Sequence, residues 1–545
     1  MRLFAGVVRS TGVVRSMRPA GLLGFARAAL RTSFGPHLAV MFYAQTQPDK
    51  EALVEYSERG VTRLSWAELD ATINRLANAL LARGAGGRPV ALMLPNTSEY
   101  LLAQYALARI GATAIQISYH LKPGEIAHIL ANAEPHATLV HAEQLAAISE
   151  ARAQVGQAGP MIVVGAADRG IAAMGPEVAA WDAAIAAAAP AAPARQRGDG
   201  GGMIVYTSGT TGKSKGAHRT WRATGYEPVA DLMHQVGIRA DDRHLVVCPL
   251  YHRAAPGFVV MLMALGATIV LMNHFDPERA LDIIERERVT CTLMVPTMIV
   301  RLANLPDDAR TGARTASLRW VMSVAAPLST DAARRFMQRF GPILWNFYGA
   351  TETGLVTLAG PDDHLARPGT IGRALFGNEI WLVGDTGREV ATGEIGELYV
   401  RNSMLISGYH KNAEAMQSAQ RDGMFSVGDL ARRDGDGYYY LESRKHDLVI
   451  SGGVNIYPRE IEDHLLAHPA ILDAAVIGVP DPEWGESLRA FVVLRPGHAL
   501  SEPEVIAYCR DGLADFKRPR KVAFVAELPR NPTGKVLKRE LRGPV

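Results

Sequence analysis

Between residues 65 and 140 the sequence alternates helix-like and strand-like segments, and this alternation restricts the fold more than any other feature. Ser65 and Glu68 form a capping box, and the apolar side chains that follow recur on one helical face. Buried strands and further helices are then expected in alternation over the ranges 89–94, 100–110, 112–117, 124–132 and 137–140. Such alternation predicts a parallel sheet covered by helices, so the expected fold class is α/β.

The alternation resumes beyond residue 225 and later changes character. Helices or strands are expected within 226–236, 245–248, 256–272, 277–287, 290–295, 318–323 and 331–340, while 179–202 is an Ala/Pro/Gly-rich stretch that predicts a connector. Short β segments with turns between 369 and 400 predict a small β subdomain. The residues after 444 predict a compact α+β unit. Since 545 residues exceed what one core accommodates, we expect several subdomains.

Composition and charge exclude several classes of protein. The formal net charge of +3 gives no reason to expect a nucleic-acid partner. Three widely spaced cysteines form no CxxC pair, which argues against a disulfide framework or a structural zinc site and fits a reducing cytoplasm. The apolar stretch 254–275 is long enough to cross a bilayer, but Pro256, Gly257 and Gly266 interrupt it. A buried helix followed by a buried strand is the better interpretation.

The N-terminal residues 1–45 form a basic extension. No Asp or Glu occurs before residue 49, and six arginines lie among apolar residues. Three interpretations stay open: a basic amphipathic anchor at a membrane surface, an organelle transit peptide, or a helical extension packed on the domain. We favour the first, so the expected location is the cytoplasm, with peripheral contact to the inner face of a membrane.

The stretch from Tyr206 to Gly216 has the composition of a phosphate-binding loop. It follows a strand-like lead and combines glycines, which turn backbone N–H groups toward one point, with hydroxyl donors and two lysines. Its end resembles a Walker A loop, but that motif requires glycine where Thr207 stands. A flexible linker is the alternative, but linkers do not place lysines so regularly after a buried strand.

Three further loops carry candidate chemistry. Tyr348–Gly354 follows a strand and offers an aromatic ring for a purine, a hydroxyl and the Glu352 carboxylate for Mg²⁺. Asp429 and Arg444 offer a carboxylate and a cation for ribose hydroxyls. The proline-framed tip 529–535 presents Lys535, which could neutralise charge where a carboxylate attacks a phosphate. Each signal alone is also compatible with an ordinary solvated turn or a surface charge.

Together the loops resemble the adenylate-forming superfamily, which contains acyl- and aryl-CoA synthetases, peptide-synthetase adenylation domains and firefly luciferase. The loops 206–216, 348–354, 451–453 and 532–535, with Asp429 and Arg444, occur in that family's order and approximate spacing. The resemblance implies a large N-terminal domain of parallel-sheet subdomains over 46–444, a hinge at 445–446 and a small C-terminal domain over 447–545. The small domain is expected to be mobile and to rotate between two half-reactions. In the first a carboxylate attacks the α-phosphate of ATP, and in the second the thiol of CoA attacks the acyl-adenylate.

The resemblance also implies roles for individual residues. Lys535, Thr351 and Glu352 would act in catalysis together with His252, and Thr210 and Glu352 would lie near Mg²⁺. The implied nucleotide- and CoA-binding residues are Thr207, Ser208, Gly209, Thr210, Thr211, Gly212, Lys213, Ala325, Ala326, Pro327, Tyr348, Gly349, Asp429, Arg444, Ser451, Gly452 and Gly453. Three positions depart from relatives: His446 at the hinge, Ser443 and Val454. They leave the ATP site intact and bear on domain rotation.

The acid pocket is expected to be apolar. His252 matches a position that often gates this pocket in the family, although a satisfied core histidine is the alternative. We expect the lining to come from the helix after residue 222 and from 251–257, 295–298 and 323–325, without a cation for a second charged group. A plain hydrophobic acid therefore fits better than an amino acid.

The expected activity is that of an AMP-forming acid–CoA ligase for a medium- or long-chain fatty acid, with ATP, Mg²⁺ and CoA. An aryl- or steroid-side-chain-CoA ligase stays open. A fatty-acyl-AMP ligase that loads a carrier protein is less favoured, because no insertion separates residues 369 and 444 and no carrier follows. A non-catalytic lipid-binding relative is also less favoured, because Lys535, Glu352 and Asp429 are all present. The oligomeric state and the identity of the acid do not follow from the sequence.

Overall fold

The computed structural model describes residues 11–12, 24–26, 29, 32, 34–166, 171, 174–194, 201–207, 214–221, 225–306, 311–531 and 534–542. Most of the basic extension therefore lies outside the described residues, as do the loop residues 208–213 and the tip residues 532–533. The last part of the extension forms α3 (His37–Thr46), which buries Val40 and Tyr43 against the large domain. That segment is packed on the domain, so it is not available as a membrane anchor.

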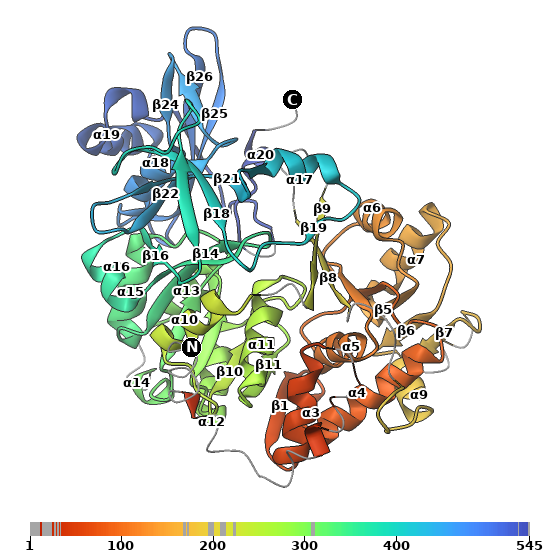
Figure 1. Cartoon of the computed structure of the whole chain (residues 1–545). Helices are drawn as coiled ribbons and strands as arrows, with labels where there is room; N and C mark the ends of the chain where they lie inside the picture. Colours follow the sequence, from red (N-terminus) through yellow and green to blue (C-terminus); the bar gives the residue numbers. More distant parts are fainter. Residues whose placement is uncertain are drawn as a thin grey trace.

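The described residues form three sheets (Figure 1). The largest has β17 (Glu379–Val383), β18 (Gly396–Arg401), β21 (Met424–Arg433), β22 (Tyr439–Arg444), β16 (Thr370–Ala374), β15 (Gly354–Ala359), β14 (Leu344–Ala350), β13 (Trp320–Ser323), β12 (Cys291–Met294), β10 (Arg243–Val246), β11 (Thr268–Met272), β1 (Glu51–Ser57) and β2 (Gly60–Ser65) in that order, with β20 (Gln420–Arg421) beside β21. Its middle strands pair in parallel and its outer strands are antiparallel. The short β segments expected after residue 369 thus extend one large sheet as far as Arg444.

The second sheet contains the strand that precedes the phosphate loop. Its order is β19 (Gly408–Tyr409), β9 (Lys215–Thr220), β8 (Gly202–Thr207), β4 (Thr113–Gln116), β3 (Val90–Met93), β5 (Ala137–His141), β6 (Met161–Val164) and β7 (Val178–Ala180). The pairs from β8 to β7 are parallel, which confirms the predicted parallel sheet. The pair β8–β9 is antiparallel and is connected by the loop 208–214.

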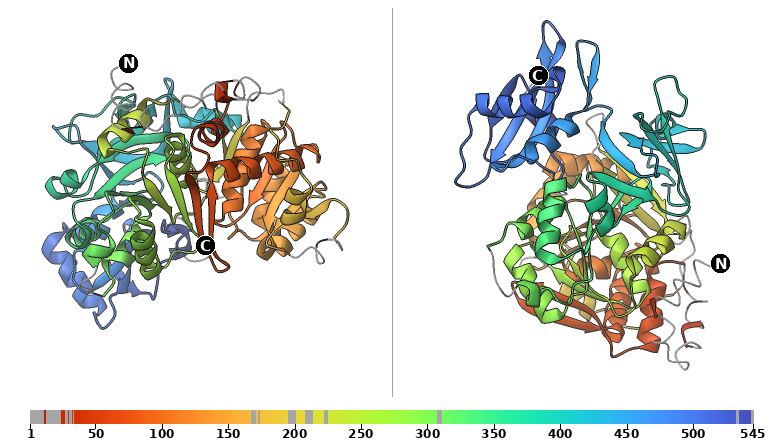
Figure 2. Two further views of the ribbon diagram at one scale, coloured as in Figure 1. Left: turned by 90° about the horizontal axis from the view of Figure 1, so that it is seen from below. Right: turned by 90° about the vertical axis from the view of Figure 1, so that its left-hand side faces the viewer.

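The third sheet belongs to the C-terminal unit, drawn in blue at the top of Figure 2, right. Its strands are β24 (Val454–Ile456), β23 (Val449–Ser451), β26 (Gly485–Leu494), β25 (Ile471–Asp481) and β27 (Lys521–Phe524). This unit touches the large domain where Arg459 Nη2 donates to the carbonyl of Leu328 at 3.2 Å. The predicted α+β unit is confirmed, and its strand β27 pairs in parallel with β26.

Helices cover the sheets and pack their apolar faces against the buried strands. They are α4 (Trp66–Leu81), α5 (Ser98–Arg109), α6 (Pro123–Ala133), α7 (Leu145–Gln154), α9 (Trp181–Ala186), α10 (Glu227–Val236), α11 (Ala254–Ala264), α12 (Pro277–Glu287), α13 (Pro296–Ala303), α14 (Thr311–Arg314), α15 (Thr330–Phe340), α16 (Pro361–Ala366), α17 (Ala413–Ala419), α18 (Pro458–Leu466), α19 (Glu502–Gly512) and α20 (Lys538–Leu541). The capping box is formed, since the Glu68 N–H donates to Ser65 Oγ and the Ser65 N–H donates to Glu68 Oε2.

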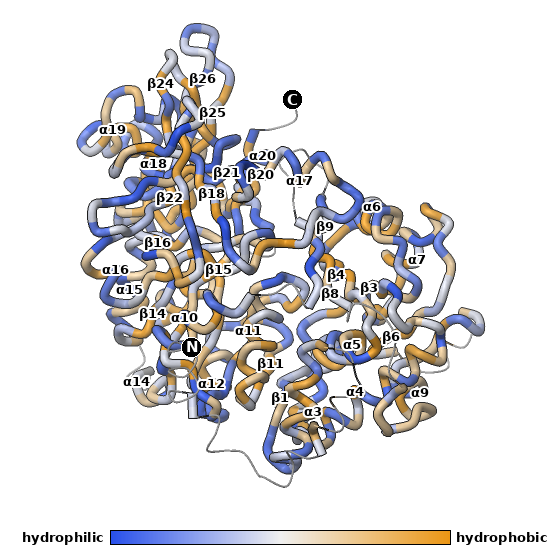
Figure 3. Tube along the Cα trace, viewed as in Figure 1, coloured by the Kyte–Doolittle hydropathy of each residue, from blue (hydrophilic) through white to orange (hydrophobic). Residues whose placement is uncertain are grey.

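Two sequence expectations on apolar and low-complexity segments have different outcomes. The stretch 254–275 is the helix α11 followed by the buried strand β11, as predicted, and Figure 3 shows it among the hydrophobic parts of the chain. In the described residues, no helix has the length and apolar character needed to cross a bilayer. The connector over 179–202 was wrong at its start. Trp181 is 7% exposed and anchors α9 in the core, so ordered structure continues to Ala186.

Candidate active site

Asp429 and Arg444 face each other across two strands of the large sheet. They are paired residues of β21 and β22, and Arg444 Nε lies 3.0 Å from Asp429 Oδ1. Tyr348, at the end of β14, donates its hydroxyl hydrogen to Asp429 Oδ2 at 2.7 Å. Burial and the negative charge of Asp429 raise the pKa of Tyr348, so this hydroxyl stays a donor. The structure thus joins the predicted ribose pair to the predicted purine platform.

Glu352 lies in the turn between β14 and β15 and is 7% exposed. Thr207 Oγ1, at the end of β8, and the Tyr409 hydroxyl, in β19, both donate to Glu352 Oε1 at 3.1 Å. Both hydrogen bonds end on the same oxygen, so among the described residues Oε2 has no hydrogen-bond donor and is available to a cation. A buried carboxylate with one available oxygen fits a Mg²⁺ ligand, and Mg²⁺ commonly takes one or two carboxylates together with substrate phosphates.

The phosphate loop itself, Ser208–Lys213 and with it the predicted metal residue Thr210, lies outside the described residues. Its two flanks are described. Thr207 and Lys215 are paired residues of β8 and β9, and both line the cavity that contains Glu352. The loop therefore starts and ends at this cavity.

Lys535 lies beside the ribose pair, although it belongs to the C-terminal unit. Burial and the nearby positive charge of Arg444 lower its pKa to about 8, while Asp429 and Asp447 oppose this shift. Gly534 touches the large domain, since a Cβ built on it would lie 3.1 Å from Thr297 Oγ1. The C-terminal unit is thus in an arrangement that brings its lysine near Asp429 and Arg444 of the large domain.

The cavity has a volume of about 2380 Å³ and is bounded by both units. Most predicted site residues line it, namely Thr207, His252, Ala325, Ala326, Pro327, Tyr348, Gly349, Thr351, Glu352, Asp429, Arg444 and Lys535. Ser451, Gly452 and Gly453 do not line it in this arrangement. They form the turn between β23 and β24, where Gly452 lies under the ring of Trp484.

His252 is a neutral wall residue of the cavity. Burial and the neighbouring His120 lower its pKa to about 4, so the imidazole carries no charge at neutral pH. Its Nε2 is buried without a hydrogen-bond partner among the described residues. The unpaired ring nitrogen argues against a fully satisfied core histidine, and the role of His252 as a gate stays a prediction.

Two arginines near Glu352 were missed by the sequence analysis. Arg253 follows His252 and lines the cavity, so a cation is present at this wall. The expectation that the acid pocket itself contains no cation stays a prediction. Arg219 lies in β9, is 3% exposed and donates from Nη2 to the carbonyl of Thr351 at 3.5 Å. The available signal was the position of Arg253, a cation directly before the apolar sequence of α11.

Comparison with protein families agrees with this geometry. Residues 42–410 match the family model for the AMP-binding enzyme, and residues 460–535 match the model for the AMP-binding enzyme C-terminal domain. The chain belongs to the AMP-binding enzyme family. This is the adenylate-forming superfamily, and its members among the relatives of this chain are AMP-forming acyl-CoA ligases, which use ATP, Mg²⁺ and CoA.

Curated relatives of this family match almost the whole chain. Feruloyl-CoA synthase of Amycolatopsis is 36% identical over 89% of this chain and 94% of that protein. The long-chain-fatty-acid–CoA ligase FadD13 of Mycobacterium tuberculosis is 32% identical over 92% and 96%. Among solved structures, ATP-bound MatB of Rhodopseudomonas palustris has a TM-score of 0.81 at 32% identity and covers 91% of this chain and 96% of that chain. The protein is therefore an AMP-forming acid–CoA ligase, whereas its relatives differ in the acid that they activate.

Proposed function

We propose that this ligase activates a medium- or long-chain fatty acid and converts it through an acyl-adenylate to its CoA thioester. The supporting observation is the apolar wall beside Glu352, to which Val229 of α10 and Phe258 and Met261 of α11 contribute. Each buried methylene is worth about 0.8 kcal/mol, so KM should fall by roughly fourfold per added methylene until the wall ends.

We assign the nucleotide to the cavity side formed by the large sheet. Asp429 and Arg444 bind the ribose, Tyr348 and the segment Ala325–Pro327 enclose the adenine, and Glu352 holds Mg²⁺. When bound, Mg²⁺ offsets the negative charge of the phosphates. Thr351 reaches the α-phosphate.

Lys535 serves the adenylation step in this proposal. The acid's carboxylate oxygen forms a bond to the α-phosphorus, and the bond to the leaving pyrophosphate breaks. The ammonium group of Lys535 stabilises the charge that gathers on the transferred group. The small domain, which we place at 447–545, then rotates about the hinge 445–446 and brings Ser451–Gly453 to the cavity for thiol attack and release of AMP.

An aryl acid is the second candidate. Phe258 and Phe347 both line the cavity, and their rings are nearly parallel, with centroids 5.7 Å apart and an interplanar angle of 11°. Such a pair presents a flat aromatic surface at the cavity wall, which suits a planar ring.

The decisive experiment incubates the purified protein with Mg-ATP and two series of acids, one graded in chain length and one in ring content. AMP release is measured with and without CoA. A maximum at one alkyl chain length supports the fatty acid, whereas a preference for ring acids supports the second candidate. Pyrophosphate exchange without a CoA thioester would contradict both and indicate transfer to a carrier.

Lys535→Ala is the matched control for the order of the two half-reactions. It should abolish AMP release from the free acid. With chemically prepared acyl-adenylate and CoA it should form thioester at near the wild-type rate. Loss of both half-reactions in a folded variant would contradict the assignment of Lys535 to adenylation alone.

We also propose peripheral membrane contact through the basic N-terminal residues. The support is compositional, since the arginines of residues 1–34 lie among apolar residues without an acidic one. The full chain should co-sediment with anionic vesicles. A chain that starts at Gly35, and so keeps the packed helix α3, should stay in the supernatant. Equal sedimentation of the two chains would contradict it.

A further inference from the structure

Two arginines lie near Glu352, the half-buried Arg253 and the buried Arg219, and the reaction as described does not use them. Arg253 lines the cavity at the beginning of α11, next to the gate residue His252. Arg219 lies in β9, is 3% exposed and does not line the cavity. Each feels the negative charge of Glu352, so the three groups are close in space.

The positive charge of this pair is not balanced by the described part of the chain. The Nε and Nη1 atoms of Arg219 are buried without a partner, and its bond from Nη2 to the Thr351 carbonyl is long. The guanidinium group of Arg253 forms no hydrogen bond or ion pair with a described residue, and no acidic residue occupies the first turn of α11. Glu352 is the carboxylate whose negative charge acts on both guanidinium groups.

The electrostatics are consistent with an unsatisfied cation pair. Burial, followed by repulsion from Arg253, lowers the pKa of Arg219 to about 8, although Glu352 opposes the shift. Burial lowers the pKa of Arg253 to about 10, again against the attraction of Glu352. A buried charge is costly unless it is paired, so an anion that enters the cavity is stabilised there.

The location selects which anion this is. Arg219 contacts the carbonyl of Thr351, and Thr351 and Glu352 form the loop where the phosphate chemistry is proposed. The N–H groups at the start of α11 lie on the same side as Arg253, and they also favour negative charge. The apolar wall residues Phe258 and Met261 follow one to two turns further along the helix. An acid with its tail along α11 therefore has its carboxylate at Arg253.

We propose that Arg253 binds the reacting carboxylate of the acid substrate, and that Arg219 is a positioning residue that adds positive potential from behind the wall. This inference rests on the proposed acid–CoA ligase reaction and deepens it. The guanidinium group keeps its proton throughout. It holds the carboxylate ionised and oriented while one carboxylate oxygen forms the bond to the α-phosphorus and pyrophosphate leaves.

The test compares Arg253→Met, which keeps the side-chain length without the charge, with Arg253→Lys, which keeps the charge. A hydrogen bond to a charged group contributes about 1.5–3 kcal/mol, so the KM for every acid should rise by roughly 10- to 150-fold in Arg253→Met. The KM for ATP should change by less than about threefold. Arg253→Lys should restore part of the loss. Arg334→Met, at an exposed position of α15, is the matched control and should change neither constant.

A binding measurement separates charge from packing. The dissociation constant of the preferred acid is compared with that of its primary amide, which has the same tail and no charge. Arg253→Met should raise the dissociation constant of the acid and leave that of the amide unchanged. Arg219→Gln should have the same effect by a smaller factor. If Arg253→Met does not fold, the acid-to-amide ratio in Arg253→Lys provides the same test.

Several outcomes would overturn the inference while leaving the proposed function intact. A rise in the KM for ATP alone would show that the arginines bind phosphate. An effect confined to dicarboxylic acids would show that they bind a second, remote charge. Equal weakening of acid and amide would show a packing role. If the wild-type protein releases AMP with no acid at all, the proposed function fails instead, and the variants are not needed to see it.

Discussion

Lys535 illustrates how burial tunes a single residue for one step. Its pKa is lowered to about 8, so the ammonium form is present below that pH and is lost as the pH rises through it. We expect kcat/KM for ATP in the adenylation half-reaction to fall above about pH 8, because this ratio reports the free enzyme. The measurement is a pH profile of pyrophosphate exchange. Thioester formation from prepared acyl-adenylate should show no matching decline, and a parallel decline would refute the assignment.

Ala325 shows local backbone strain at the nucleotide side of the cavity. It has a φ of +71°, a left-handed conformation that costs an alanine more than a glycine. Ala325→Gly should therefore stabilise the protein by up to about 1 kcal/mol, seen as a higher midpoint in denaturant unfolding. Ala326→Gly, at a neighbour without positive φ, is the control and should destabilise it. The same sign for both variants would contradict the role of strain.

Site residues that belong to sequence motifs were predictable, whereas residues that join the site only through tertiary packing were not. Asp429, Arg444 and Glu352 were identified from motif order, and the structure places all three at one cavity. Arg219 and Arg253 were missed because an arginine in a strand or before a helix has no distinctive local pattern. What sets them apart is their position near Glu352, which depends on packing between distant parts of the chain.

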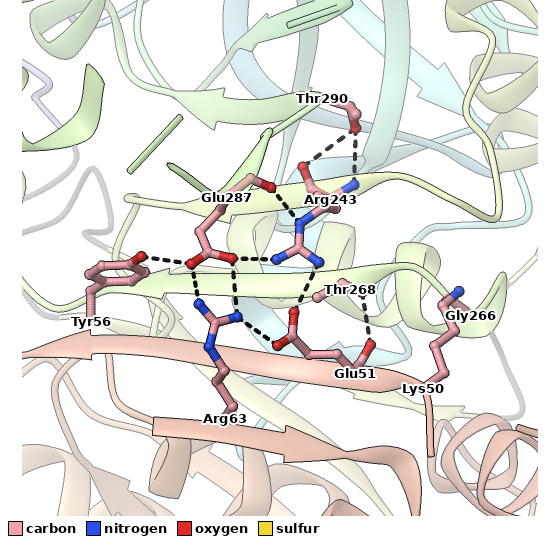
Figure 4. A network of polar contacts seen from close by, with 9 residues as sticks. All are labelled: Lys50, Glu51, Tyr56, Arg63, Arg243, Gly266, Thr268, Glu287 and Thr290. Carbon is pink, nitrogen blue, oxygen red and sulfur yellow. Dashed lines mark hydrogen bonds and ion pairs between the residues drawn. The ribbon is translucent and has the colours of Figure 1, made fainter. Parts of the chain in front are cut away.

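An ion network connects the N-terminal hairpin to the rest of the large sheet (Figure 4). Glu287, at the end of α12, is 6% exposed and pairs at 2.5 Å with both Arg63 of β2 and Arg243 of β10. The Tyr56 hydroxyl also donates to Glu287 at 2.6 Å. Arg63 and Arg243 in turn reach Glu51 at 2.6 and 2.9 Å. This network fixes the hairpin β1–β2 at the sheet edge.

We predict that Glu287→Gln lowers the free energy of unfolding by about 1–3 kcal/mol at pH 7. Burial raises the pKa of Glu287, but bonds from Arg63 and Tyr56 outweigh it and leave the pKa lowered. The stabilisation is therefore present above the unfolded-state pKa and is lost as the pH falls through the folded-state value. Denaturant unfolding at pH 7 and pH 3.5 should show that the gap between wild type and variant closes in acid.

The exposed pair Arg401–Glu379 provides the control for this network. Its side chains are 51% and 44% exposed, so Glu379→Gln should change stability by no more than about 1 kcal/mol. A gap that stays constant with pH in Glu287→Gln would show that the network acts through shape alone.

Element prediction succeeded where apolar residues formed an amphipathic helix or a short continuous run. The helices α4 and α6 bury one face, and the strands β3 and β4 are short apolar runs that are almost fully buried, so the expected alternation is followed closely. The hairpin β1–β2 was missed, since β2 is exposed and lacks an apolar face. The hairpin β23–β24 was missed because each strand has only three residues. Strand pairing between segments that are far apart in the sequence cannot be predicted from local sequence patterns.

At the scale of the whole molecule, Gly534 controls how closely the C-terminal unit approaches the large domain. It has a φ of +78°, and an added Cβ would lie 3.1 Å from Thr297 Oγ1 of α13. We expect Gly534→Ala to slow adenylation by roughly 10- to 100-fold, because a small misplacement of Lys535 is costly. Single-turnover assays of both half-reactions measure this effect. Thioester formation from prepared acyl-adenylate should be nearly unchanged.

Gly497→Ala is the matched control in the same unit. Gly497 also has a φ of +78°, but an added Cβ meets nothing within 4 Å. The two variants share the backbone strain and differ in the contact with the large domain. Equal slowing in both would attribute the effect to strain in the small unit.

The carboxylate of Glu352 also connects two sheets through hydrogen bonds. Thr207 and Tyr409 belong to the second sheet, and their hydroxyls are fastened to a residue that belongs to the large one. A ligand that binds this carboxylate changes the strength of its hydrogen bonds to Thr207 and Tyr409. Ligand binding at the proposed nucleotide site should therefore change the rates of amide hydrogen exchange in β8 and β19. Ligand occupancy would then change how firmly the second sheet is held to the large sheet.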